Sequence, residues 1–450
     1  MPRLRTGIAA ASLSLAMFLT GCSLTGTAGS ASVTATATDN VLDENKLHTI
    51  SVEVDEGTLK EMIQTYLDKG DKEWIKATVT IDGETFENVG IKLKGNSSLR
   101  NITVDTPAQE LPLRIRLDKY VDGQNADGYS DFTVRSNSSE TAINEAVALD
   151  LLSDAGLASE EAISTRFSVN GSDEKLRLTV QNLDDTWVKQ NFPDAGADSV
   201  LYKSEADGNW SWRGQNGDYS SSFEIEAGKD DYEPLIELLD LLNNGTAAEI
   251  AEKLPDLLDV DSFATYLAFE DLIDNFDDID GPGNNSYLFW DSATKKFTVV
   301  AWDHNLAFGS SPGGAGGRGG QGGGRPAGER PSGMPEGAAP SGMPEGAGPD
   351  GNQNGSNQNG ANQNGANQNG GGRGRMSKEN PLSTAFMANT EWKALYEQAK
   401  TDLQAKLIDE GTLSETVDDW SQLLTTGASD LTSTDTITTE ADKIRSYADK

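Results

Sequence analysis

Alternating hydrophobic and polar positions run through the first half of the chain and predict a β-rich part. Gly83 and the pair Asn170-Gly171 mark turns between apolar runs. Arg114 and Arg116 are two residues apart, so they share one face of their strand. The alternation predicts strands over residues 48–54, 76–81, 89–94, 113–117, 167–170 and 176–181.

Helical spacing replaces this alternation in two regions. Ile143, Val147 and Leu151 form an apolar stripe that ends at Gly156, a typical residue after a helix C-terminus. Beyond the last predicted strand pair the chain is expected to be mostly helical, and Asp261 is expected to cap one helix. This order predicts an α+β fold with two lobes. The clearest of the later helices are expected over residues 235–242 and 247–258.

A predicted hairpin carries the richest chemistry. Residues 286–290 and 297–301 form two strands joined by a short turn. If they pair about that turn, Asn285 faces Trp302 across the ladder. Asn285 and Asp303 are therefore expected together at the open end of the hairpin, beside the acidic loop that precedes it.

Carboxylate and amide oxygens that converge beside one loop are typical ligands of hard divalent ions. Mg²⁺ and Mn²⁺ often share such ligands with substrate phosphates. Calcium is the first competitor, but an EF-hand aligned on Gly281 would place Phe276 and Tyr287 where carboxylates are required. The alternative is that these acids only cap the helix and solvate the loop. Asp303 favours a metal site, because it follows a core strand and so carries a carboxylate toward a cleft.

A long polar segment follows this hairpin. From Ser310 to Pro381 the chain contains no Val, Ile, Leu, Phe, Tyr, Trp or Cys, and SGMPEGA occurs at Ser332 and again at Ser341. Such a composition cannot bury enough apolar surface to offset the entropy of the chain. Residues 310–376 are therefore predicted to be a disordered insertion.

Apolar residues return after the insertion. Phe386, Trp392 and Tyr396 stand at helical spacing, which predicts further packed helices. We therefore expect the insertion to interrupt a domain: residues 377–450 form the C-terminal helical part of the domain that begins with residues 46–309.

The first residues predict export and lipid attachment. A basic start precedes an apolar stretch over residues 8–18, which is too short to span a bilayer as a stable helix. The following Leu-Thr-Gly-Cys22 resembles the lipobox of bacterial lipoproteins, and Cys22 is the only cysteine of the 450 residues. We expect a signal peptide over residues 1–21 and a lipidated flexible tether over residues 22–45. The protein would then be lipid-anchored at the extracytoplasmic face of the cell membrane.

Composition excludes several classes of function. The chain carries 72 acidic and 36 basic residues, a formal net charge of -36, which would repel the phosphates of a nucleic acid. A zinc site built from His and Cys is implausible, because there are two histidines and the cysteine is expected to carry lipid. A Ser-His-Asp hydrolase is set aside, since no Gly-x-Ser-x-Gly elbow is present.

Four motifs follow one another along the chain: NVGIKLKGNSS from Asn88, PLRIRLDKY from Pro112, an acidic loop from Asn275 that leads into NNSYLFW, and AWDHNLAFG from Ala301. In this order they resemble the CotH kinase family, named for the spore coat protein H kinases. The resemblance covers most of residues 48–309 and also residues 380–396. It implies an atypical protein-kinase-like fold, ATP with Mg²⁺ or Mn²⁺ as cofactors, and phosphorylation of Ser, Thr or Tyr in protein substrates.

The resemblance assigns roles to residues around the hairpin. Asp303 matches the metal-binding aspartate that plays the part of the aspartate in the kinase Asp-Phe-Gly motif. Asn285 would be the second metal ligand. Asp277 matches the catalytic aspartate that orients the acceptor hydroxyl, and Asp280 is its rival because its spacing to Asn285 equals the spacing in ordinary kinases.

The resemblance also implies a nucleotide-binding surface in the first half of the chain. Arg114 is the candidate phosphate-contacting cation, with a solvated strand arginine as the alternative. Glu145 is the candidate partner of such a cation, as in a kinase ion pair, with an exposed helical glutamate as the alternative. One loop would lie over the nucleotide, unless it is only a turn, and consists of Lys94, Gly95, Asn96 and Ser97.

Two functions from different classes remain. The first is a membrane-anchored, metal-dependent protein kinase that acts on exported or cell-surface proteins. The second is a non-catalytic kinase-like surface scaffold or adhesin. The sequence favours the first. Two departures from the family pattern count against activity: Gln181 stands where many relatives carry glutamate, and Asn305 where many carry aspartate. Nucleotide binding with metal discriminates between the two.

We predict that Cys22→Ser releases the protein from the membrane. Cleavage and lipid attachment both need the thiol, so the variant should carry no lipid and should no longer be extracted with membrane lipoproteins. Metabolic labelling with a fatty acid, followed by fractionation, measures both. Membrane retention of an unlipidated variant would contradict the prediction.

Overall fold

The computed structural model describes residues 40–206, 208–282, 284–310 and 380–449. Asn40–Lys450 forms one compact unit. The predicted signal peptide, Cys22 and the insertion lie outside the described residues, apart from Ser310. No helix within the described ranges has the length and apolar character needed to cross a membrane.

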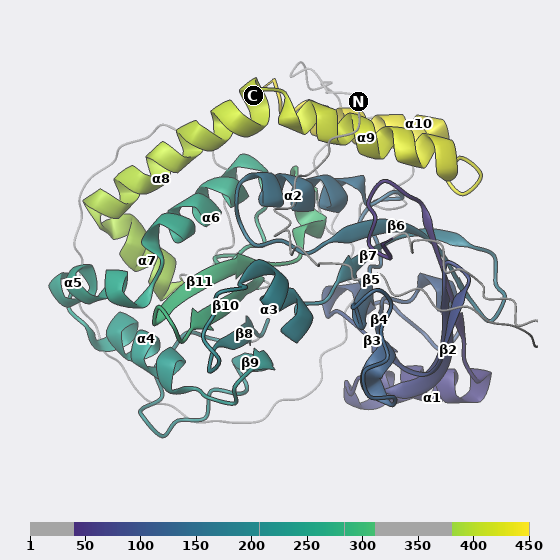
Figure 1. Ribbon diagram of the computed structural model, residues 1–450, viewed down its shortest axis with the longest axis horizontal. Helices are drawn as coiled ribbons and strands as arrows, with labels where there is room; N and C mark the ends of the chain where they lie inside the picture. Colours follow the sequence, from purple (N-terminus) through teal and green to yellow (C-terminus); the bar gives the residue numbers. More distant parts are fainter. Residues whose placement is uncertain (1–39, 207, 283, 311–379, 450) are drawn as a thin grey trace, which may run out of the picture. The chain divides into compact units, whose positions relative to one another are not determined.

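The first half of this unit is a closed barrel (Figure 1). The strands follow the order β1-β2-β3-β4-β5-β7-β6. β1 pairs with β6 in parallel, and the other neighbours are antiparallel. Closure leaves the sheet without an open edge. The strands are β1 (His48–Glu53), β2 (Ile75–Ile81), β3 (Glu84–Leu93), β4 (Leu113–Arg116), β5 (Asp131–Val134), β6 (Ala162–Val169) and β7 (Lys175–Gln181).

Inward-facing apolar residues fill the barrel. The helix α1 (Glu56–Lys69) follows β1 and buries Leu59 and Met62 against it. Val41 and Leu42, which the sequence pattern assigns to the tether, are buried in the same core. The strand residues that are at most 1% exposed include Val52, Val79, Ile91, Ile115 and Phe132.

A second sheet has the strand order β11-β10-β8-β9. Its strands are β8 (Val200–Ser204), β9 (Phe223–Gly228), β10 (Ser286–Asp291) and β11 (Lys296–Ala301). The predicted hairpin is confirmed, whereas β8 and β9 lie where the sequence pattern predicts mostly helix. β8 lies between β9 and β10 and is almost entirely buried, so it lacks the two-residue alternation that identifies a half-exposed strand.

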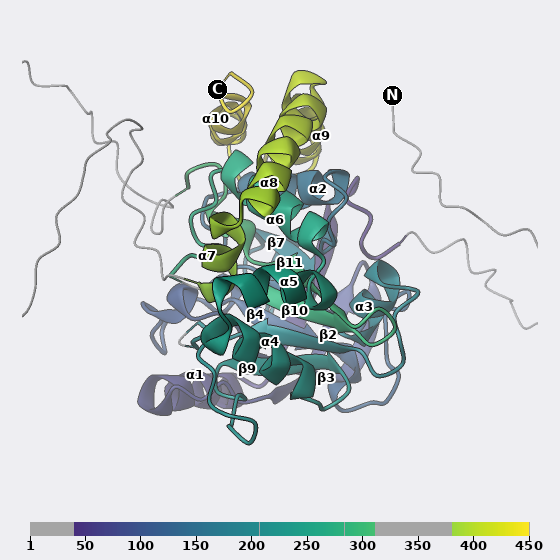
Figure 2. The same cartoon turned by 90° about the vertical axis from the view of Figure 1, so that its left-hand side faces the viewer.

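The helices before and after the insertion pack together. α8 lies along α6 (Figures 1 and 2). The rings of Phe263 and Phe386 meet edge to face with centroids 5.0 Å apart, and the Tyr396 hydroxyl donates to Asp271. The helices are α2 (Ile143–Asp154), α3 (Asp185–Asn191), α4 (Glu233–Asn244), α5 (Ala247–Leu257), α6 (Val260–Leu272), α7 (Pro381–Ala388), α8 (Thr390–Leu403), α9 (Thr412–Gly427) and α10 (Thr434–Arg445).

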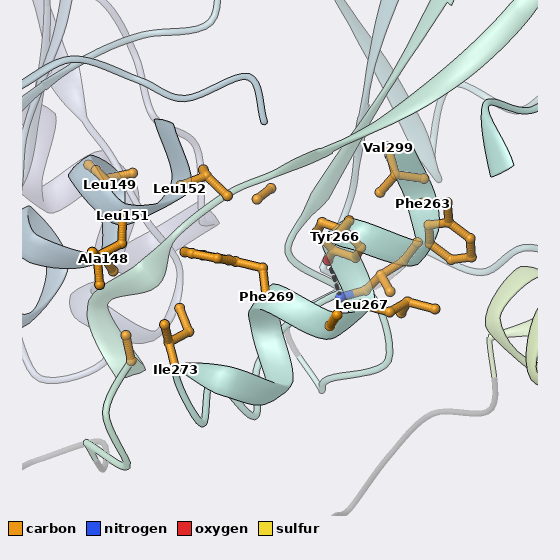
Figure 3. Packing of buried hydrophobic residues seen from close by; sticks show 14 of the residues in the cluster. Ala148, Leu149, Leu151, Leu152, Phe263, Tyr266, Leu267, Phe269, Ile273 and Val299 are labelled. Atoms are coloured by element: carbon orange, nitrogen blue, oxygen red, sulfur yellow. Dashed lines mark hydrogen bonds between the residues drawn. The ribbon is translucent and has the colours of Figure 1, made fainter. Parts of the chain in front are cut away.

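The core between α2 and α6 fixes the position of α2. Phe269 extends from α6 toward the leucines of α2 (Figure 3), and Phe269, Leu151 and Leu152 are each at most 1% exposed. Tyr266, on the same helix, accepts a hydrogen bond from the Ile279 amide at 3.1 Å. Most residues of α2 are buried, including the polar Asn144 and Glu145.

The α+β prediction is confirmed, and its details differ at two points. The β-rich part is a closed barrel, a feature that local alternation does not specify, because closure depends on the parallel β1–β6 pair between distant segments. α6 is capped by Asp259, which accepts from the Ser262 amide at 3.0 Å, and Asp261 lies within its first turn. The expected Asp261 cap is therefore wrong by two residues.

A buried histidine ties the segment before β1 to the barrel. His48 is 2% exposed; its Nδ1 lies 2.6 Å from Asp82 and its Nε2 2.9 Å from the Asp43 carbonyl. Burial tends to lower the pKa of His48, but its hydrogen bond to Asp82 and the nearby negative charge raise this pKa above the ordinary 6.5. The charged pair therefore stabilises the fold fully below the unfolded pKa, and its contribution is lost as pH rises through the folded pKa.

We predict a pH-dependent stability loss in His48→Gln. Its deficit in the free energy of unfolding, measured with urea, should be larger at about pH 5.5 than at about pH 8.5, because only the protonated imidazole gains from Asp82. Asp82→Asn should show the same trend. Equal deficits at both pH values would show that His48 contributes packing and not charge.

Candidate functional site

The hairpin β10–β11 brings Asn285 and Asp303 to one end of the second sheet. Ser286 pairs with Ala301, so Asn285 and Trp302 are the next residues across the ladder, and Asp303 follows. The predicted register is confirmed. Asp303 has a left-handed backbone, with φ of 65°, a conformation that is uncommon for a residue other than glycine.

Arg135, which directly follows β5, joins Asp303 to the helix α2. Its Nη2 lies 2.6 Å from Glu145 Oε1, and its Nη1 lies 3.5 Å from Asp303 Oδ1. The guanidinium also lies over the Trp302 ring, 4.8 Å from the centroid. Arg135 is 9% and Glu145 1% exposed, so this is a buried ion pair. Sequence reasoning missed Arg135, because it did not identify the four-residue strand β5.

Carboxylates outnumber cations around Arg135. Burial raises the pKa of Glu145 to about 7, although the charge of Arg135 opposes this shift. Glu160 is 3% exposed, and burial raises its pKa as well. Burial would lower the pKa of Arg135, but the charges of Glu145 and Asp303 raise it. Burial therefore disfavours the charged forms of Glu145 and Glu160, and an additional cation bound nearby would favour them.

Trp302 receives a second cation from the barrel. The Nζ of Lys94 lies 5.4 Å from the centroid of the Trp302 ring. Burial and the nearby charges of Lys203 and Arg114 lower the pKa of Lys94 to about 7. Lys94 and Arg135 therefore converge on the same tryptophan, one residue before the candidate metal ligand.

The predicted nucleotide loop turns at Gly95. Gly95 has φ of 99°, and a Cβ there would lie 2.1 Å from Ser98 Oγ, so this position requires glycine. Asn96 accepts a hydrogen bond from Lys72 Nζ at 2.8 Å, and Ser97 begins a short 3₁₀ turn. Asn96 and Ser97 are exposed. The loop is thus held at one side and open to solvent at its tip.

Arg114 contacts two carboxylates other than Glu145. Its Nε and Nη2 lie 2.9 and 2.7 Å from the two oxygens of Asp131, and Nη2 lies 3.4 Å from Glu226. Burial opposes the charge of Arg114, but these carboxylates raise its pKa. The expected pairing of Arg114 with Glu145 is wrong, because Arg135 occupies that place and Asp131 on the neighbouring strand already binds Arg114.

A charged cavity of about 330 Å³ lies beside Arg114. Cations of β3 and β4 line one part of it and carboxylates of β9 line another. Such a lining suits a charged ligand better than an apolar one. The residues around it include Trp74, Lys92, Arg116, Glu224 and Glu226.

The acidic loop folds closely between α6 and β10. Asn275 donates to Glu270 at 2.8 Å, which fixes the start of the loop. A Cβ on Gly281 would lie 2.4 Å from the Cα of Asp277, so glycine is required where the loop returns. Asp277 and Asp280 are both half-buried. Both candidate catalytic aspartates therefore lie in the loop that leads into β10.

The hairpin end fits a metal site that is shared with a ligand. Within the described ranges, no three His, Cys, Asp or Glu side chains are grouped so as to hold an ion by themselves. Mg²⁺ in phosphate-handling sites is usually held by one or two carboxylates together with the phosphates. Oδ1 of Asp303 is buried without a hydrogen-bond partner in the described structure, and Asn285 is the next residue beyond the Ser286–Ala301 pair at the same end of the hairpin. Asp303 therefore supplies the one carboxylate that such a site needs, and Asn285 is the candidate second ligand.

We predict that Arg135 and Glu145 are energetically coupled. Arg135→Met leaves Glu145 buried without its cation, so the free energy of unfolding should fall by roughly 3–5 kcal/mol. Adding Glu145→Gln should then cost less than it does in the parent, with a coupling of roughly 1–3 kcal/mol in a denaturant double-mutant cycle.

Arg114 supplies the matched control for this cycle. Arg114→Met and Glu145→Gln should be additive to within about 0.5 kcal/mol, because the two side chains share no partner. Coupling in the Arg114 cycle and additivity in the Arg135 cycle would reverse the assignment.

Comparison with protein-family models matches residues 91–449 to the model described as CotH kinase protein. The match includes nearly all the residues of the site described above, together with the helices that follow the insertion. No protein among the curated sequences matches the chain. Because the family model spans most of the 450 residues, the chain belongs to the CotH kinase protein family.

Proposed function

We propose that this protein is a membrane-anchored, extracytoplasmic protein kinase that transfers the γ-phosphoryl group of ATP to protein hydroxyls with a divalent metal ion. Membership of the CotH family supports a kinase-like function. The observation that carries the proposal is the position of Arg135 between Glu145 and Asp303.

This contact resembles the arrangement that protein kinases require. There, a cation on a strand pairs with a glutamate on a helix, and an aspartate from the other side of the cleft holds metal. Here Arg135, Glu145 and Asp303 stand in the corresponding places. The chain order also agrees, because β3, the Gly95 loop, β4, β5 and α2 follow one another as strand, phosphate loop, strands and helix do in kinases. This agreement supports an atypical kinase-like architecture with two lobes.

Two cations are placed to bind the phosphates. Lys94 and Arg135 both lie over Trp302, beside the candidate metal ligand Asp303. Because the pKa of Lys94 is lowered to about 7, an anionic phosphate beside it would stabilise its charged form. Gly95 lets the backbone of the covering loop approach a phosphate closely.

The acidic loop supplies the groups for the acceptor. Asp277 would orient the acceptor hydroxyl and take its proton, and Asp280 is the alternative for this role. Asp303 and Asn285 would hold Mg²⁺ or Mn²⁺, which neutralises negative charge on the phosphates during transfer.

The substrates are expected to be exported or cell-surface proteins. This follows from the proposed lipid anchor at Cys22. Asn380, the first described residue after the insertion, donates to the Ile279 carbonyl of the acidic loop at 3.4 Å. The described chain therefore resumes beside the loop that carries Asp277 and Asp280.

We predict that substitution of the metal ligand Asp303 and substitution of the candidate catalytic Asp277 have different effects. Asp303→Ala removes a charged metal ligand, so it should abolish both phosphoryl transfer and metal-dependent ATP binding. Asp277→Ala leaves the metal ligands in place, so it should bind Mg-ATP nearly normally and lose transfer by roughly 10²- to 10⁴-fold. Calorimetry and transfer from labelled ATP measure the two properties.

Asp256→Ala, an exposed carboxylate on α5, is the matched control and should change neither property. If Asp280→Ala shows the pattern expected for Asp277→Ala, the roles of the two loop aspartates must be exchanged. A parent protein that binds no nucleotide with Mg²⁺, Mn²⁺ or Ca²⁺ would reject the kinase and favour the scaffold or adhesin.

A further inference from the structure

The N-terminus of α2 has no side-chain cap of its own. Its N-cap residue, Ala142, has a left-handed backbone with φ of 55° and no side chain that can accept a hydrogen bond. A non-glycine residue in this conformation is strained by about 1–3 kcal/mol and persists only when its surroundings hold it. The amides of Ala142 and Ile143 are bonded locally, to the hydroxyls of Ser139 and Thr141 at 3.0 and 3.2 Å. The segment that carries these hydroxyls is itself held from elsewhere in the chain.

Glu440, on the C-terminal helix α10, supplies that support. Its two carboxylate oxygens accept hydrogen bonds from the backbone amides of Glu140 and Thr141, at 2.9 and 3.1 Å. The Thr141 hydroxyl donates to the same carboxylate. The negative charge of this carboxylate also interacts favourably with the positive end of the α2 dipole. The Glu440 side chain, about 300 residues away in sequence, thus fixes the two residues that precede the N-cap of α2.

The first turn of α2 contacts the segment that follows Asp303. Asn144 Nδ2 donates to the carbonyl of Asn305 at 2.8 Å, and the Ser138 hydroxyl donates to the same carbonyl at 2.6 Å. Glu145, the next residue of α2, pairs with Arg135. A shift of the α2 N-terminus would therefore move both the Asn305 carbonyl and the partner of Arg135.

The C-terminal helices also hold α2 further along. Trp420 of α9 donates its indole N–H to Asp150 at 2.8 Å. α9 and α10 lie beside α2 (Figure 1). Hydrogen bonds to Glu440 before the start of α2 and from Trp420 near its end therefore hold the helix at both ends. Apolar residues of α9 also belong to the core cluster that contains α2, so these polar contacts act together with apolar packing.

We infer that Glu440 is a positioning residue for the phosphoryl-transfer site, because its hydrogen bonds to Glu140 and Thr141 fix the N-terminus of α2. This inference rests on the proposed kinase function for its effect on rate, but not for its effect on structure. Among the described residues, Glu440 bonds Glu140 and Thr141 and neither Arg135 nor Asp303. It acts through α2, by fixing where Glu145 and the Asn305 carbonyl lie.

Hydrogen exchange tests the structural part without reference to activity. In Glu440→Gln and Glu440→Ala, amides in residues 138–147 and 303–309 should exchange at least tenfold faster, while the barrel strand β2 should be unchanged. Asp435→Asn removes one charge from an exposed position of the same helix and should leave both segments as in the parent. Unchanged exchange in the Glu440 variants would overturn the inference.

Kinetics test the consequence for the site. Well below the melting temperatures, Glu440→Ala should lower kcat/KM roughly 10²-fold, as expected when a reacting group is misplaced by about 1 Å. Glu440→Gln, which keeps an acceptor oxygen, should lie between Glu440→Ala and the parent. In a Glu145→Gln background, Glu440→Ala should have a clearly smaller further effect than in the parent, because the route through Glu145 is already lost and only the route through the Asn305 carbonyl remains.

A full additional loss in that background would show that Glu440 does not act through Glu145, which also overturns the inference. The exchange and kinetic measurements together distinguish the positioning role of Glu440 from the proposed kinase function. If the parent protein transfers no phosphoryl group and the exchange rates still change as expected, the proposed function fails while the positioning role stands.

Discussion

A buried guanidinium holds the site together. Removing the charge of Arg135 from water is costly unless ion pairs and packing compensate it. The compensation comes from Glu145 on α2, Asp303 after β11 and the face of Trp302. These groups belong to the barrel, a buried helix and the second sheet, so the charge is stabilised only when all three elements are correctly placed. The stability of the fold and the geometry of the site therefore depend on the same contact.

The rest of the fold supports this contact by fixing its three contributors. Closure of the barrel holds β5, and hence the backbone at Arg135, between β4 and β7. The apolar core holds α2 against α6 (Figure 3). Pairing of β10 with β11 directs Asp303 out of the sheet, and its left-handed backbone turns the chain immediately afterwards. The helices beyond the insertion also pack against α2 and α6, and the family match extends through them.

Sequence reasoning was most successful where a local pattern specifies the structure. The β10–β11 register and the position of Asn285 beside the strand that leads to Asp303 followed from alternation and a short turn. It failed where long-range strand pairing determines the structure. β8 is a buried strand without alternation, and the four-residue strand β5, which places Arg135, was not identified. The partner of Glu145 was wrongly identified for the same reason, because two arginines compete for carboxylates and only the three-dimensional distances assign Arg114 to Asp131.

We propose that Asp303 and Asn285 complete a metal-nucleotide site beside Arg135. A crystal structure of the protein with Mn²⁺ and a non-hydrolysable ATP analogue tests this site directly, since anomalous scattering identifies the position of manganese. We predict an anomalous peak within bonding distance of an Asp303 oxygen, roughly 2.0–2.3 Å, with the phosphates on the side of Lys94 and Arg135. A nucleotide bound elsewhere, or manganese held without Asp303, would contradict it.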